Sequence, residues 1–74
     1  MNHTISQVKK GNRHAMDKLY KSTVDELFYY CTQLCGNKHD AEDLVQDTYL
    51  TAFQKIEQYK RDENFKGWLH TIAL

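Results

Sequence analysis

Two cysteines and a histidine follow one another at intervals of four residues, at Cys31, Cys35 and His39. Thiolate and imidazole groups are preferred zinc ligands, and a zinc site needs three or four of them to converge. Gly36 and Asn37 are expected to end a helix before His39, so the three side chains would not share one face. No other histidine is an obvious fourth ligand. We therefore predict no metal site, and interpret the two cysteines as small core residues.

Carboxylates are the other groups that could carry chemistry. The pairs that helical spacing would bring together lie on faces expected to be exposed, where nothing favours a general acid or base. The sequence contains neither a Ser-His-Asp arrangement nor a glycine-rich loop that could hold a phosphate. We therefore expect neither an enzyme nor a protein that binds a cofactor.

Basic residues flank two aromatic residues near the end of the chain. Such an arrangement can bind single-stranded nucleic acid through phosphate contacts and base stacking. The alternative is an ordinary solvated loop followed by two core aromatics, and the spacing favours this alternative for Trp68. The role of the basic residues stays open at this point. The residues of this segment are Lys60, Arg61, Phe65, Lys66 and Trp68.

The bulk composition limits the class of protein. A chain of 74 residues forms one domain at most, and the absence of Pro with only 3 Gly favours helices joined by short connections. Ten basic and ten acidic residues give a net charge of +0, which argues against strong independent DNA binding but permits a contact made with a partner's help. The sequence has no apolar run that could cross a membrane and no signal-peptide core, which predicts a cytoplasmic protein without a membrane partner.

Apolar periodicity predicts an all-α fold, a compact bundle of about four helices. We expect helices at residues 4–10, 13–35, 40–59 and from 65 onward, with Asn12, Asp40 and Asn64 as N-caps. Thr4 and Gln7 match a capping box for the first helix. Gly11 fits the left-handed position that would close it. The short connection after Cys35 makes the second and third helices antiparallel neighbours.

Each long helix carries an apolar stripe. The second helix also carries a second, adjacent stripe, so it must meet two neighbours rather than one. In the third helix the expected core residues are Ala41, Leu44, Val45, Thr48, Ala52, Ile56 and Tyr59, with Tyr49 and Phe53 beside them. In the second helix they are Met16, Leu19, Thr23, Leu27, Tyr30 and Leu34, then Val24, Phe28, Cys31 and Cys35. In the fourth helix they are Phe65, Trp68, Leu69, Ile72 and Ala73.

The opposite face of the third helix is unusual. It comprises Asp43, Gln46, Asp47, Leu50 and Gln54, which step by three or four residues. A solvated face normally mixes Lys with Glu, whereas this face combines two carboxylates with amides and an outward-pointing leucine. One interpretation is a solvated face with a single exposed apolar residue, which is common. The other is a face that binds a partner.

Three sequence segments together resemble region 2 of bacterial sigma factors, particularly the extracytoplasmic-function (ECF) group. They are DAEDLVQDTYLTAF in the third helix, FKGWLHTIA in the fourth, and GNRHAMDKLY at the start of the second. The resemblance covers nearly the whole chain, so residues 1–74 are expected to form one region 2-like helical domain. It implies a role in transcription initiation, and an anti-sigma factor is a further candidate partner.

In that family the polar face of the third helix docks on a coiled coil in the largest subunit of core RNA polymerase. Transferred by motif position, this implies that Asp43, Gln46 and Asp47 bind the polymerase, with Leu50 and Gln54 extending the same face.

The family's next segment helps to open promoter DNA and contacts the displaced non-template strand. The resemblance implies DNA-binding residues in or beside it, without matching them one by one to family contacts. The candidates are Lys60, Arg61, Asn64 and Lys66.

The sequence departs from the family pattern at its end. The basic stretch that reads the −10 promoter element would begin after Leu74, and the domain that reads the −35 element is absent. We therefore expect a truncated last helix, in a fragment of a longer protein or a shortened gene product. The alternative function is a helical interaction module, or a regulator that imitates the sigma surface without binding DNA.

Overall fold

The computed structural model describes residues 2–60 and 64–74 and confirms an all-α fold for these residues. Arg61 and most of the polar loop predicted before the fourth helix lie outside the described residues. The helices are α1 (Asn2–Lys9), α2 (Arg13–Cys35), α3 (Lys38–Gln54) and α4 (Phe65–Ala73), with a short 3-10 helix η1 (Ile56–Gln58) after α3.

The long helix α2 begins and ends where the sequence predicts. The side-chain oxygen of Asn12 accepts a hydrogen bond from the Ala15 N–H at 3.1 Å and so caps the first turn. At the other end Gly36 has φ 79°, and its N–H donates to the Thr32 carbonyl at 2.9 Å. This left-handed conformation costs a glycine little, which explains why α2 ends there.

The start of α3 corrects the prediction that Asp40 is its cap. Asn37 is the N-cap: its Oδ1 accepts from the Asp40 N–H at 2.8 Å, and its Nδ2 donates to Asp40 Oδ2 at 2.9 Å. The two side chains thus satisfy one another across the first turn, in the manner of a capping box. The predicted cap of α1 is also wrong, because that helix begins at Asn2 and Thr4 lies inside it.

The end of α3 is the second correction. The α-helix stops at Gln54 rather than running to residue 59, and the Lys55 N–H is shared between the carbonyls of Thr51 and Ala52. The chain then tightens into η1. Ile56 and Tyr59 are nevertheless buried, because the tighter turn still directs them into the core.

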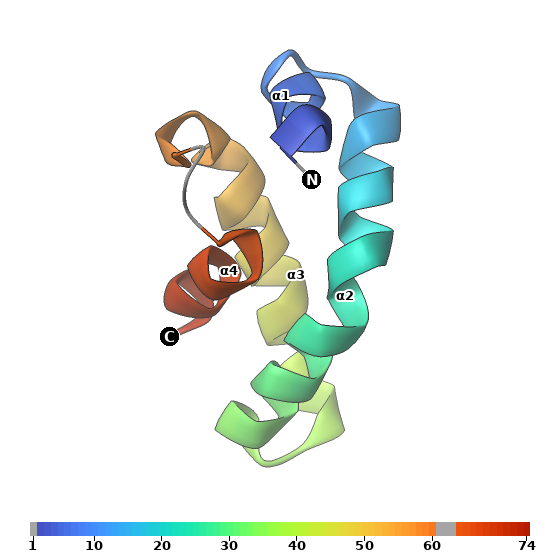
Figure 1. The fold of residues 1–74 in the computed structure, drawn as a ribbon. Helices are drawn as coiled ribbons and strands as arrows, with labels where there is room; N and C mark the ends of the chain where they lie inside the picture. The colour runs from blue at the N-terminus through green and yellow to red at the C-terminus, as the bar shows by residue number, and fades with distance from the viewer. Residues whose placement is uncertain (1, 61–63) are drawn as a thin grey trace.

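The core lies where the helices meet (Figure 1). α2 and α3 form an antiparallel hairpin, α4 packs against both of them, and α1 packs against α2 and η1. The largest fully buried side chains include Leu19, Leu27, Phe65 and Leu69.

Some predicted core residues are less buried than expected. Leu34 is 46% exposed, because it lies in the last turn of α2, where no other described element covers it. Trp68 is half-buried, and its ring packs on Tyr59 and Phe65 at centroid distances of 5.3 and 5.8 Å rather than deep between α2 and α3. Leu44, on the predicted stripe of α3, is also only half-buried.

Polar contacts join α2 to α3 and α2 to α4. In the core between α2 and α3 the hydroxyls of Thr23 and Tyr49 lie 2.5 Å apart. At the edge between α2 and α4, His70 Nε2 lies 2.9 Å from Glu26 Oε2, and the His70 ring stacks on Tyr30 at a centroid distance of 3.8 Å. Each of these contacts fixes the rotation of one helix against its neighbour.

Candidate functional site

The polar face of α3, which comprises Asp43, Gln46, Asp47, Leu50 and Gln54, is exposed along its whole length. Leu50 is 63% exposed, although its neighbours Tyr49 and Ala52 are buried. Within residues 2–60 and 64–74, neither Asp43 nor Asp47 lies within ion-pair distance of a cation. The carboxylates of this face are therefore available to a partner.

Buried residues on the other side of α3 hold this face in place. Ala41, Val45 and Ala52 are buried against the neighbouring helices, and the Thr48 hydroxyl donates to the Leu44 carbonyl at 2.7 Å. The bond between Thr23 and Tyr49 anchors the middle of α3 to α2. A face carried on a packed helix presents its side chains in a fixed pattern, as a binding surface requires.

Burial also sets the ionisation of two groups behind this face. It raises the pKa of the Tyr49 hydroxyl. Burial, followed by the nearby Cys35 and Glu26, raises the pKa of the Cys31 thiol. A thiol with a raised pKa is a poor nucleophile and a poor metal ligand. In the part of the chain that the structure describes, no group of three or more His, Cys, Asp or Glu residues could hold a metal ion.

An apolar seam, which was not predicted as a surface from the sequence, runs beside the polar face. It is formed by Tyr20, Val24 and Phe28 of α2 and Phe53 of α3; Tyr20 is 39% exposed and the other three are half-buried. The ring of Tyr49 joins the two helices beneath the seam, with centroids 4.7 Å from Tyr20 and 6.0 Å from Phe53.

The seam lies on the side of the α2–α3 hairpin that α4 does not cover. Helical spacing puts Glu26 and Tyr30 on one side of the buried stripe of α2, and Val24 and Phe28 on the other. His70 of α4 contacts the first pair. The signal was present in the sequence, since the second apolar stripe of α2 required another neighbour. Among the described elements, none covers it fully at Val24 and Phe28, which are only partly buried.

The predicted DNA-binding residues are spread along the approach to α4. Lys60, Asn64 and Lys66 are exposed, and Arg61 lies outside the described residues. Asn64 is the N-cap of α4, because its Oδ1 accepts from the N–H groups of Lys66 at 3.1 Å and Gly67 at 3.5 Å. Its side-chain oxygen therefore has a structural use, whereas neither lysine has an ion pair among the described residues.

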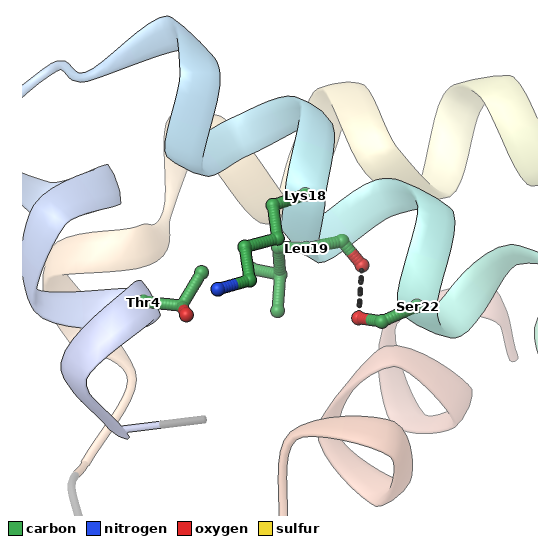
Figure 2. A pocket seen from close by; sticks show the side chains of 4 residues that line it. All are labelled: Thr4, Lys18, Leu19 and Ser22. Atoms are coloured by element: carbon green, nitrogen blue, oxygen red, sulfur yellow. Dashed lines mark hydrogen bonds between the residues drawn. The ribbon is translucent and has the colours of Figure 1, made fainter.

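A shallow pocket between α1 and α2 does not add a site. Figure 2 shows that Thr4, Lys18, Leu19 and Ser22 line it. The Ser22 hydroxyl donates to the Leu19 carbonyl at 3.0 Å, which leaves Lys18 and Thr4 to meet a ligand. Two polar side chains on an open surface are too few to specify a class of ligand, so we assign no binding site to this pocket. None of the helices in the described residues is both long and apolar enough to span a membrane.

Comparison with known proteins identifies the family. The family model for sigma-70 region 2 matches residues 19–74. The chain is 33% identical over 69 residues to the ECF RNA polymerase sigma factor SigW of Bacillus subtilis, covering 93% of this chain and 37% of SigW. It is 38% identical over 66 residues to SigE of Mycolicibacterium smegmatis (85% and 25% coverage). It is 44% identical over 65 residues to SigG of Mycobacterium tuberculosis (88% and 17% coverage).

The chain therefore belongs to the sigma-70 region 2 family, and the resemblance to ECF sigma factors is confirmed. The family consists of transcription initiation factors rather than enzymes. The chain spans well under half the length of these three relatives.

Proposed function

We propose that this domain docks on the coiled coil of the largest subunit of core RNA polymerase through the polar face of α3. The exposure of the whole face carries the proposal: two carboxylates without an ion partner in the described residues surround an exposed Leu50. A coiled coil presents charged side chains beside apolar ones, and one whose exposed charges are basic would complement both kinds of group.

The apolar seam extends this docking surface onto α2. Phe53 lies one helical turn from Leu50, so the exposed leucine connects the polar face to the seam. A partner helix that lies on both would cover apolar side chains that the domain itself leaves partly exposed. An apolar centre with a charged rim is the usual composition of a protein interface. An anti-sigma factor that covered the same surface would block docking.

We further propose that the approach to α4 contacts promoter DNA on the non-template strand. Lys60, Arg61, Asn64 and Lys66 are the residues assigned to this contact. The exposure of Lys60 and Lys66 supports it, because free cations attract phosphates. Residues 1–74 would act as one region 2-like domain, and reading of the −10 element would need residues of a longer protein.

Reversing the charge of Asp47 tests the docking. Asp47→Lys should weaken binding to the polymerase coiled coil by about 1–3 kcal/mol, if it removes a charge-assisted contact. Glu57→Lys is the matched control, because Glu57 is also exposed and has no ion pair among the described residues but lies on η1. Binding is measured by fluorescence anisotropy with the purified coiled coil, and a thermal melt checks that both variants fold. Equal affinity of wild type and Asp47→Lys would refute the docking surface.

A further inference from the structure

The zero net charge of the chain conceals two oppositely charged parts, while residues 55–74 add four basic and three acidic residues. Residues 1–24 contain five basic residues and one acidic residue, whereas residues 25–54 contain one basic and six acidic residues. The 23-residue helix α2 runs along the long axis of the molecule, whose largest extent is 35 Å. The α1–α2 connection and η1 therefore lie at one end, and the α2–α3 connection lies at the other (Figure 1).

Contacts within the domain fix the geometry of the basic end. Ile5 and Val8 are buried and hold α1 in place, and Lys9 Nζ donates to the Tyr59 carbonyl at 2.9 Å. This bond joins two segments that are 50 residues apart in the sequence. The residues that follow the bonded pair are Lys10 and Lys60, and both are exposed.

The start of α2 supplies a third cation. Gly11, with φ 84°, turns the chain into α2, and Arg13 is the first residue of that helix and is exposed. We define the basic corner as Lys10, Arg13 and Lys60. In residues 2–60 and 64–74, none of the three lies within 4.0 Å of a carboxylate oxygen. Asp17, one turn along α2 from Arg13, is instead paired with Lys21 at 3.0 Å.

Screening lets the two ends act independently. The Debye length is about 8 Å at physiological ionic strength, much shorter than the 35 Å extent of the molecule. The acidic end therefore does not cancel the potential at the basic corner, although Glu57 on η1 reduces it. In the composition, the zero net charge argued against DNA binding. It does not describe the local charge of the basic corner, which is the surface that DNA would contact.

We propose that the basic corner is a second DNA contact, which binds the phosphodiester backbone beside the proposed contact of Lys60 and Lys66. The inference rests on the proposed DNA contact of the domain and extends it to α1 and the start of α2. The corner presents cations without aromatic or amide groups that could read bases, so it would add affinity without sequence preference. Its role would be to position the strand that other residues read.

The chain offers a matched pair of variants for the test. Arg13 and Lys38 are the first residues of α2 and α3; each follows an asparagine N-cap, is exposed and has no ion pair among the described residues. Arg13→Gln and Lys38→Gln therefore remove the same charge from the same helical position at opposite ends of the molecule. Their affinities for a fluorescein-labelled single strand and its duplex are measured by anisotropy over a series of salt concentrations.

Arg13→Gln should lower the slope of log K against log salt by about 0.7 for the single strand or about 0.9 for the duplex, as one lost phosphate contact does. If binding is unchanged at 1 M salt, this corresponds to an approximately tenfold loss of affinity at about 50 mM salt. Lys38→Gln should change neither quantity. The form of DNA that shows the larger loss identifies the strand state that the corner holds.

An equal effect of the two variants would overturn the proposal, as would the absence of DNA binding by the wild type at the lowest salt concentration. Measuring the affinity of the same variants for the polymerase coiled coil distinguishes a failure of the DNA proposal from a failure of the docking proposal. Arg13→Gln should dock with wild-type affinity, whereas Asp47→Lys should lose docking and keep the wild-type salt slope for DNA. Thermal melts of all variants confirm that the domain is folded in each assay.

Discussion

Removing the hydroxyl of Thr23 should destabilise the domain more than removing the hydroxyl of Tyr49, although the two form one hydrogen bond. Thr23 Oγ1 lies 2.8 Å from the Leu19 carbonyl and 2.5 Å from Tyr49 Oη, and both side chains are buried. A threonine hydroxyl has one hydrogen, and the carbonyl can only accept. Thr23 therefore donates to Leu19, and Tyr49 donates to Thr23.

The direction of this hydrogen bond determines how much stability each substitution removes. Tyr49→Phe keeps the ring and leaves Thr23 bonded to Leu19, so it should lower the free energy of unfolding by about 1 kcal/mol, the net value of one hydrogen bond. Thr23→Val has nearly the same shape but leaves the Tyr49 hydroxyl buried without an acceptor. The desolvation of that group adds about 1–3 kcal/mol. Once Thr23 is Val, the further change Tyr49→Phe removes the unsatisfied group and should restore part of the lost stability.

Urea unfolding followed by circular dichroism measures all four proteins of this cycle. With a slope of about 1–3 kcal/mol/M for a small protein, a change of about 1 kcal/mol shifts the urea midpoint by about 0.3–1 M, so the differences are resolvable. The expected order of stability is wild type, Tyr49→Phe, the double variant, then Thr23→Val. If the double variant were less stable than Thr23→Val, or if Tyr49→Phe were the more damaging single change, the assigned direction of the bond would be wrong.

Two further predictions use the glycines and the cysteines. Gly36→Ala should destabilise the domain by about 1–2 kcal/mol, because φ 79° is strained for any residue with a side chain even though the space around it is open. Gly67→Ala should instead stabilise the domain by about 0.5–1 kcal/mol, since Gly67 lies inside α4 and an added methyl meets only ordinary contacts at 3.8 Å. Opposite shifts of the urea midpoint would confirm both predictions. Iodoacetamide should label the half-buried Cys35 first. It should reach Cys31, which is 0% exposed and has a raised pKa, only when the domain unfolds. Equal labelling rates of the two cysteines in the folded domain, measured by mass spectrometry, would contradict this prediction.

The sequence predicted the helices where a local signal defines them. Asn12 and Asn64 act through side-chain oxygens that accept from N–H groups within one turn, and Gly36 acts through its own backbone, so their roles followed from residue type. The start and end of α3 were less predictable. Asn37 and Asp40 are both good caps, and the choice between them depends on the reciprocal bond that they form. The stop at Gln54 has no glycine or proline to announce it.

The candidate surfaces were likewise predictable from the sequence only in part. Periodicity was sufficient to place Asp43, Asp47 and Leu50 on one exposed face. It could not show that Tyr20 and Phe53 form a seam, because that depends on which side of the hairpin α4 covers. The basic corner also depends on tertiary structure, since the bond from Lys9 to the Tyr59 carbonyl joins segments that are 50 residues apart.

The two-residue connection between α2 and α3 has a consequence for how the domain folds. Closing so short a loop costs little chain entropy, so the two longest helices can pair before distant segments meet. We expect the α2–α3 hairpin to form the folding nucleus, with α4 and then α1 adding to it. The amides in the middle of α2 and α3 should accordingly exchange with solvent most slowly. The partner-binding face would then be carried by the part of the domain that opens least often.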